Sequence, residues 1–183
     1  MRKVLELFLE EAAEKHAQRA MAYRGEFLRF GEPHIQGSCG LERYLDYGDW
    51  LAAVRAMQDE KTSPWGAAAT TYFSLHQGDG RILGTIQLRH KLTDELLQGG
   101  GHIGYAIRPT ERGKGYATQQ LELALREADR KKIPSVMVSC EKCNAASAAV
   151  IRKCGGVLGW EGYRESFHTW IQIYWIDRRM MQG

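Results

Sequence analysis

The sequence predicts one domain of mixed α and β structure, and three observations support this fold class. The chain has 183 residues, which is enough for a single domain with a substantial core. Apolar residues make up 44% of it and charged residues 26%, as in ordinary globular proteins. The local patterns follow the order two helices, three strands, helix, strand, helix, two strands. Alternating segments of this kind place the chain in the α/β (α+β) class.

The first third of the chain is predicted to be mainly helical. Residues 5–23 are rich in Ala, Glu, Lys and Leu and contain no Gly or Pro, which favours a helix. Residues 24–40 are interrupted by glycines and a proline, so we expect an irregular segment there. A second helix is expected over 41–59, followed by a connection over 61–66.

Residues that favour strands dominate after Gly66. Two strands are predicted over 69–76 and 82–89, joined by a hairpin turn at Gly78-Asp-Gly80. A third strand over 102–107 follows a run of three glycines. The remaining elements are expected to be a helix over 115–131, a strand over 135–140, a helix that Asn144 can cap, and strands over 157–160 and 169–176.

Composition excludes some classes of partner. The net charge is +3, and the basic residues are interspersed with acids, so nucleic acid has little support. No apolar run reaches the roughly 18 residues of a membrane helix. Acidic residues interrupt the basic N-terminus before a signal-peptide core could form. We therefore expect a cytoplasmic protein without a membrane partner.

Four cysteines raise the question of metal or redox chemistry. Cys140 and Cys143 form a C-x-x-C motif, which can bind zinc or undergo redox reactions. A structural zinc site needs four ligands, and no second such pair follows. We expect reduced thiols and no metal, with a thiol or zinc protein as an alternative.

A glycine-rich stretch, Arg112-Gly-Lys-Gly-Tyr-Ala117, precedes the helix predicted over 115–131. The N-terminus of a helix attracts anions, and glycines let a phosphate approach the backbone. Arg112 and Lys114 can add charge-assisted hydrogen bonds. The alternative is an ordinary strand-to-helix turn with a solvated basic edge. A Walker loop is excluded because Gly115 replaces its Ser or Thr, and Thr118 replaces the third glycine of a dinucleotide fingerprint.

The same hexapeptide resembles the acetyl-CoA-binding pattern of the GNAT N-acetyltransferase superfamily, (Arg or Gln)-x-x-Gly-x-(Gly or Ala). The strand sequence GHIGYAIRP precedes it, and CNAASAAVIRKCGG resembles the second motif of the superfamily. Both stretches are particularly similar to a bacterial branch of predicted acetyltransferases. The resemblance covers about 66–176 and implies a GNAT fold, a mixed and mostly antiparallel central sheet flanked by helices. It implies one N-acetyltransferase domain over 1–183, with a helical part over 1–62 and an acetyl-CoA-binding core over 63–183.

The resemblance also implies a site for acetyl-CoA as cosubstrate. Main-chain groups of 105–107 would pair with the pantetheine arm, and N–H groups of 112–117 would hold the pyrophosphate. Asn144 would bond to the pantetheine, with Ser147 beside it. The strands containing Tyr105 and Cys140 would splay apart to admit the thioester. The implied cofactor-binding residues are Tyr105, Ala106, Ile107, Arg112, Gly113, Lys114, Gly115, Tyr116, Ala117, Asn144 and Ser147.

The groups that transfer protons are harder to assign, because two positions depart from the superfamily. The acid that many relatives carry near the start of the central strand is replaced by glycines and His102. The tyrosine that many relatives carry four residues after Ser147 is replaced by Ile151.

Four candidates remain for these roles. His102 could act as a base or be structural. Glu141 could draw protons through water or be an exposed loop acid. Tyr105 could be an acid or part of the core, and His90 is a weaker candidate. An already neutral amine, with water relaying protons, needs none of them, while an N–H near Ala106 or Ile107 could polarise the thioester.

The function that follows is transfer of an acetyl group from acetyl-CoA to a primary amine. Attack would be direct, in a ternary complex, and the acceptor is expected to be a small molecule. Residues 24–40 and 160–170 are expected to line its side of the cleft. The missing tyrosine and acid support an alternative, a non-catalytic acyl-CoA-binding or sensing module. A homodimer is an open alternative.

Overall fold

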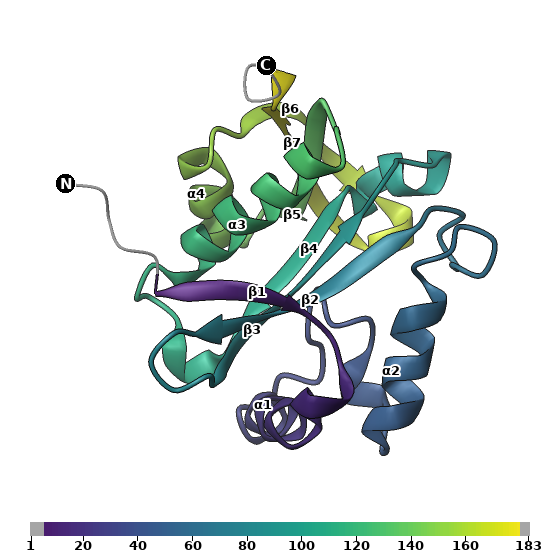
Figure 1. Cartoon of the computed structure of the whole chain (residues 1–183). Helices are drawn as coiled ribbons and strands as arrows, with labels where there is room; N and C mark the ends of the chain where they lie inside the picture. The colour runs from purple at the N-terminus through teal and green to yellow at the C-terminus, as the bar shows by residue number, and fades with distance from the viewer. Residues whose placement is uncertain (1–5, 180–183) are drawn as a thin grey trace.

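A seven-stranded sheet forms the centre of the structure, a computed structural model that describes residues 6–179 (Figure 1). The strands lie in the order β1-β2-β3-β4-β5-β7-β6. Their bounds are β1 Leu7–Glu11, β2 Ala69–His76, β3 Ile82–Arg89, β4 Ile103–Ile107, β5 Ser135–Glu141, β6 Val157–Arg164 and β7 Thr169–Asp177. All neighbouring strands are antiparallel except β4 and β5. The predicted mixed, mostly antiparallel sheet is therefore confirmed.

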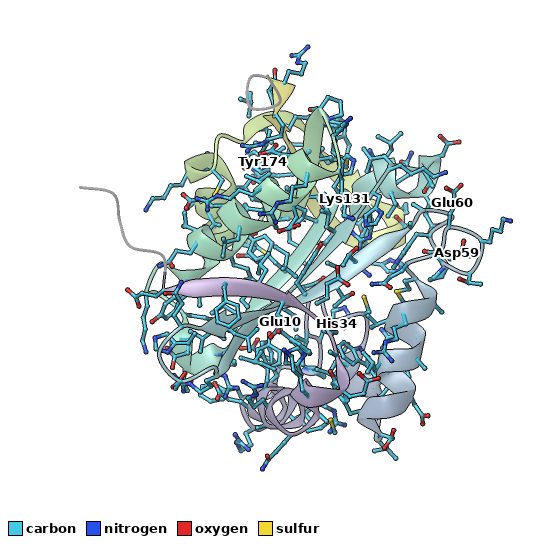
Figure 2. All side chains as sticks on the ribbon, in the orientation of Figure 1. Glu10, His34, Asp59, Glu60, Lys131 and Tyr174 are labelled. Carbon is cyan, nitrogen blue, oxygen red and sulfur yellow. The ribbon has the colours of Figure 1, made fainter. Side chains whose placement is uncertain are left out.

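Four α-helices cover the two faces of the sheet: α1 Ala17–Arg29, α2 Tyr47–Ala56, α3 Tyr116–Arg130 and α4 Ala145–Lys153. Leu121 and Leu125 of α3 and Ile151 of α4 are buried against one face. Tyr23 of α1 and Trp50 of α2 are buried against the other. Side chains fill the space between each helix pair and the sheet (Figure 2). None of the helices within 6–179 is long and apolar enough to cross a membrane.

The sheet opens between its two parallel strands. β4 and β5 share one register pair, Ile103 with Val138, whereas β5 and β7 remain paired from Ser135 to Glu141. Beyond Ile103 the two strands diverge. The main-chain groups of β4 that face β5, and those of β5 that face β4, then have no strand opposite them. The resemblance implied this splay, and the structure has it. We call this opening the wedge.

The helix predicted over 5–23 is wrong for its first half. Leu7–Glu11 form β1, which pairs with β2, and α1 begins only at Ala17. Leu7 and Leu9 face inward while Phe8 is exposed, an alternation typical of a strand. Pairing with β2 outweighs helix propensity, which is a weak preference. The first residue of the predicted helix, Leu5, lies outside the described residues.

Two other boundaries differ from the prediction. α1 continues through Gly25 to Arg29, so the segment expected to be irregular is helical at its start. α2 begins at Tyr47 because Asp46 caps it, accepting from the N–H of Asp49 at 3.1 Å. The hairpin between β2 and β3 agrees with the prediction, since the N–H of Gly80 donates to the carbonyl of His76.

Candidate active site

The glycine loop is an open helix N-terminus. Gly113 has φ +76° and Gly115 has φ +86°, in the left-handed region that favours glycine. Gly115 is the N-cap of α3 and supplies no side chain to cap it. A side chain added at Gly113 would meet nothing within 4 Å. The first N–H groups of α3 therefore face free space and can bind an anion.

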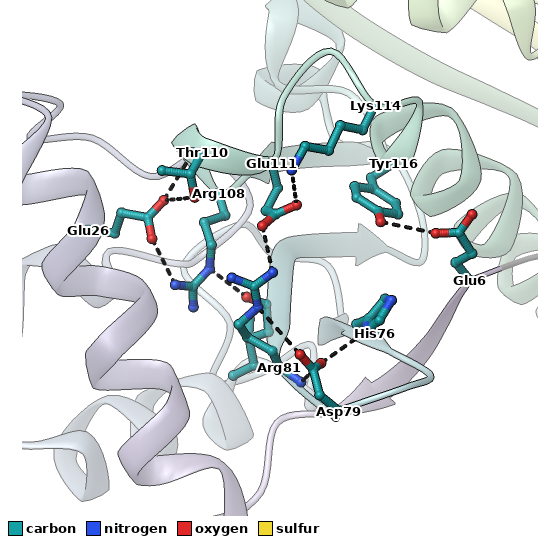
Figure 3. Close-up of polar contacts among 11 residues, drawn as sticks. Glu6, Glu26, His76, Asp79, Arg81, Arg108, Thr110, Glu111, Lys114 and Tyr116 are labelled. Carbon is teal, nitrogen blue, oxygen red and sulfur yellow. Dashed lines mark hydrogen bonds and ion pairs between the residues drawn. The ribbon is translucent and has the colours of Figure 1, made fainter.

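The two basic side chains of this loop already have carboxylate partners. Arg112 forms a two-pronged ion pair with Glu32 at 2.6 and 2.7 Å. Lys114 contacts Glu111 at 2.8 Å, and Glu111 also accepts from Arg81 at 2.6 Å (Figure 3). In this state the attraction for an anion comes mainly from the backbone rather than from these two cations.

A cavity of about 530 Å³ lies between the glycine loop, β4 and α4. Every predicted cofactor-binding residue lines it except Lys114, whose ammonium is turned to Glu111. A further wall comes from α1 and the loop after it, within the segment 24–40 that the sequence predicted to line the acceptor side only. That wall consists of Phe27, Glu32, His34 and Gln36.

Main-chain direction in β4 decides which amides face the wedge. The N–H of Arg108 donates to the carbonyl of Leu83 on β3 at 2.7 Å. Main-chain groups alternate in direction along a strand, so those of Ala106 also point to β3. The groups of Tyr105 and Ile107 point to the wedge. Of the two amides expected to polarise the thioester, Ile107 has the required direction and Ala106 does not.

A second cavity, of about 590 Å³, lies on the other side of the wedge. Tyr105, Asn144 and Ser147 line both cavities, so the two meet at these side chains. Of the expected acceptor segments, 24–40 contributes His34 and Gln36, and 160–170 contributes Phe167.

Tyr105 and Ser147 bridge the wedge. The Tyr105 hydroxyl lies 2.9 Å from Ser147 Oγ, which joins β4 to α4. Burial raises the pKa of Tyr105 to about 12, partly offset by the hydrogen bond to Ser147. The phenol is therefore protonated near neutral pH and can donate. Asn144 positions Ser147, because its Oδ1 accepts from the N–H of Ser147 at 3.0 Å and caps α4 as predicted.

Glu141 and His102, the two candidate bases, lie in different surroundings. Glu141 is exposed at the end of β5 and lines the second cavity. His102 is 5% exposed and lines neither of these cavities. Its Nδ1 accepts from the N–H of Met137 at 2.9 Å. Burial, helped by Arg89, lowers the pKa of His102 to about 4.

The geometry does not support His102 as a base. The lone pair on its Nδ1 already accepts the N–H of Met137 within the sheet, so it is not available to take a proton from a substrate. His90 lies with it in a third, shallower cavity of about 320 Å³, where its Nε2 lies 2.9 Å from Thr70 Oγ1. Neither histidine approaches the wedge. The glycines before His102 gave no indication that its ring would turn into the sheet.

The four cysteines are free thiols. Cys140 is buried at the second cavity, and Cys143 is exposed and donates to Glu141 at 3.4 Å. Within 6–179 no group of three or more His, Cys, Asp or Glu side chains could hold a metal ion.

Comparison with known proteins agrees with this geometry. The acetyltransferase (GNAT) domain family matches residues 6–157. No curated protein matches the sequence at a significant level.

Several solved structures share the fold at low sequence identity. RimL, a ribosomal L7/L12 alpha-N-protein acetyltransferase in complex with coenzyme A, is 17% identical over 95% of both chains, with a TM-score of 0.68. The ribosomal-protein-S5-alanine acetyltransferase of Vibrio fischeri is 14% identical over 96% of this chain and 94% of its own, with a TM-score of 0.71. The protein yncA of Salmonella typhimurium, solved with its cofactor acetyl-CoA, is 17% identical over 94% of both chains, with a TM-score of 0.61. Since the family match spans most of the sequence, this chain belongs to the GNAT acetyltransferase family.

Proposed function

We propose that the chain is an acetyl-CoA-dependent N-acetyltransferase that acts on the primary amine of a small acceptor by direct attack in a ternary complex. The observation that carries this proposal is the meeting of two cavities at Tyr105 and Ser147. One cavity opens onto the glycine loop, and the other extends away from that loop on the far side of these shared side chains. Both substrates can therefore be held at once with their reacting groups at the wedge.

The first cavity suits acetyl-CoA. The unpaired N–H groups of the first turn of α3 would hold the pyrophosphate. The main chain of Tyr105 and Ile107 would pair with the amides of the pantetheine arm, as an added strand does. Asn144 retains its amide N–H groups for the same arm, because only its Oδ1 is used in the helix cap.

The chain also supplies groups for each proton movement. The amine loses a proton as it attacks, and Glu141 could take it through water because this residue lines the acceptor cavity. The N–H of Ile107 faces the wedge and could stabilise the oxyanion. The protonated hydroxyl of Tyr105 could donate to the thiolate that leaves. This hydroxyl would fill the role left open at Ile151.

The size of the acceptor follows from the walls of the second cavity. Trp65, Leu96 and Phe167 line this cavity of about 590 Å³, which is in the range of small-molecule sites. RimL and the Vibrio fischeri protein carry names that describe modification of ribosomal proteins. A protein N-terminus is therefore included among the acceptors to be tested.

Binding and turnover test this proposal separately. Acetyl-CoA should raise the melting temperature of the purified protein by mass action, and ATP and NAD should raise it much less. Release of free CoA thiol should then depend on one of a panel of small amines. Stabilisation by acetyl-CoA with no turnover of any amine or peptide would favour the non-catalytic acyl-CoA-binding module. Equal stabilisation by all three nucleotides would contradict the cofactor assignment.

A further inference from the structure

Arg89, at the end of β3, is a half-buried cation that lines the second cavity and has no carboxylate partner within residues 6–179. Its Nη1 donates to the carbonyls of Gly100 and Gly101 at 2.9 and 3.1 Å. Its Nε is shielded from solvent and has no acceptor, and its Nη2 makes no hydrogen bond within the described chain. The opposite edge of the guanidinium is thus unused.

Arg108, which is more deeply buried than Arg89, shows how this fold satisfies a guanidinium. Its Nη1 contacts Glu26 at 2.8 Å, and its Nε donates to the carbonyl of Ile82 at 2.8 Å. Arg89 has no such carboxylate, and burial lowers its pKa from the ordinary value. A buried N–H without an acceptor has lost its hydrogen bond to water without a replacement, so the unused edge of Arg89 requires an explanation.

Trp65 adds a second unused donor next to Arg89. The guanidinium lies over the indole ring at 4.9 Å from its centroid. The indole Nε1 is buried without a hydrogen-bond partner, and Trp65 lines the same cavity. Two neighbouring donors without acceptors favour a ligand rich in acceptor oxygens. Arg89 Nε and Trp65 Nε1 are covered in this structure, so a ligand reaches them only when the side chains over them move. A carboxylate fits best, because Nε and Nη2 of one guanidinium present parallel N–H bonds to its two oxygens.

The position of Arg89 sets the distance from this group to the reacting atoms. A Cβ built on Gly104 would lie 4.0 Å from Arg89 Nη2, and Gly104 directly precedes Tyr105 on β4. A carboxylate at Arg89 would therefore lie close to the wedge. The acceptor amine must be only a few bonds away from it.

From this arrangement we infer that the acceptor is a free amino acid, whose carboxylate is bound by Arg89 and Trp65 while its amine points to the wedge. The inference rests on the proposed function and specifies its substrate class. Glu95 and Glu141 place exposed carboxylates at the same cavity, where they attract the ammonium form of the amine. Leu96, Phe167 and Ile171 provide an apolar wall for the side chain.

The substrate side of the test uses matched probes. The twenty common amino acids are screened with acetyl-CoA, and the best acceptor is compared with its carboxamide, with its decarboxylated amine and with a pentapeptide that begins with the same residue. We expect the amino acid to exceed each of the three by about 10²-fold or more in kcat/KM. The decarboxylated amine offers Arg89 no acceptor, and the carboxamide and the pentapeptide offer one neutral carbonyl oxygen in place of the two charged oxygens of a carboxylate. Equal turnover of the amino acid and its carboxamide would overturn the inference.

The protein side uses three variants. Arg89→Lys keeps the charge and loses the paired N–H groups, so it should raise KM for the amino acid by about tenfold or more. Trp65→Phe removes only the indole N–H and should raise KM about threefold. In both variants the preference for the amino acid over its decarboxylated amine should fall. Arg130→Gln removes an exposed arginine of α3 and should behave as wild type.

Failure of the inference is distinguishable from failure of the proposed function. One result would be acetylation of only the pentapeptide or the decarboxylated amine, at a rate that Arg89→Lys does not change. That result would support the acetyltransferase function and overturn the carboxylate site. If no amine is acetylated, calorimetric titration of the CoA-bound protein with the amino acids decides. If an amino acid binds and Arg89→Lys weakens that binding, the carboxylate site is supported. If no amino acid binds, the inference is overturned. If Arg89→Lys does not fold, Trp65→Phe and the carboxamide comparison decide by the same criteria.

Discussion

The Tyr105 hydroxyl on β4 lies 2.9 Å from Ser147 Oγ on α4, across the opening between the parallel strands. Position 151, where many relatives carry a tyrosine on this helix, holds a fully buried isoleucine. A phenol is still present at the wedge, but it comes from the strand on the opposite side. The sequence contains both residues, yet their proximity depends on how β4 and α4 meet in the fold.

Tyr105→Phe should lower kcat by about 10²-fold while CoA affinity stays within about threefold of wild type. The pKa of Tyr105 is raised to about 12, so wild type has a proton to donate and the variant has none. Steady-state rates and CoA titration measure the two quantities. Tyr163→Phe, at a half-exposed position on β6, is the matched control and should leave both unchanged. An unchanged kcat for Tyr105→Phe would show that water alone protonates the thiolate.

His102 should affect stability rather than catalysis. Its pKa is lowered from 6.5 to about 4 in the folded protein, so the unfolded state binds more protons between these values. Stability should therefore fall as pH decreases from 6.5 to 4, by roughly 3 kcal/mol from this group. Urea unfolding at pH 7 and 5 should show a smaller fall for His102→Gln than for wild type. The kcat profile should show no ionisation of this histidine near pH 6.5, and a large loss of kcat at pH 7 in His102→Gln would restore its candidacy as a base.

Much of the cofactor side could be predicted because its determinants are local. Gly113 and Gly115 adopt positive φ within a short loop, and Asn144 caps the helix that follows it. Such features depend on a few consecutive residues and are visible in the sequence. β1 could not be recognised with the same ease, because five residues form a strand only through pairing with β2, more than fifty positions later.

The acceptor side depends on contacts that no local pattern encodes. Arg89 looked like the last residue of a strand, and Trp65 looked like part of a connection. Arg89 contacts Trp65 only because the segment before β2 lies against the end of β3 in the folded chain. The ring direction of His102 likewise depends on Met137, which lies on a strand 35 positions away.

Gly115→Val should weaken CoA binding by about 10-fold or more. Gly115 has φ +86° at the start of α3, where a branched side chain is strained and would obstruct the approach of a phosphate. Gly155 has φ +92° after α4 and lines neither large cavity, so Gly155→Val is a control with comparable strain. Both variants should lose stability, but only Gly115→Val should lose CoA affinity in calorimetry. Equal CoA affinity in the two folded variants would show that the pyrophosphate does not bind at Gly115.

Glu32→Gln should tighten CoA binding by about threefold to tenfold at low salt. The carboxylate of Glu32 lines the cofactor cavity and occupies both terminal nitrogens of Arg112. Its removal reduces repulsion of the phosphates and frees the guanidinium to bind them. The gain should shrink as salt is raised, because the charges are partly exposed. Glu14→Gln breaks a similar two-pronged pair with Arg55 outside the cavities and should not change affinity. Weaker CoA binding in Glu32→Gln would mean that the pair holds the loop in its binding shape.

The pair of Glu26 and Arg108 should be important for stability. It joins α1 to the end of β4 at 2.8 Å, and both side chains are about nine-tenths buried, at 10% and 8% exposure. Glu26 also accepts from the N–H and the hydroxyl of Thr110 at 3.0 and 2.7 Å (Figure 3). Glu26→Gln leaves the guanidinium buried without a countercharge and should lower the free energy of unfolding by about 3 kcal/mol at pH 7.

Two further measurements identify the charge pair as the cause of this loss. Burial alone would raise the pKa of Glu26, but Thr110 and Arg108 outweigh it and lower the pKa below the ordinary 4.5. The stabilisation is therefore present above pH 4.5 and is lost as pH falls through the lowered pKa, so the urea stabilities of wild type and Glu26→Gln should converge as pH falls below 4.5. The double variant Glu26→Gln with Arg108→Gln should lose less than the sum of the single losses, since no charge remains buried. Additive losses that do not change with pH would show that the two side chains act through packing rather than through their charges.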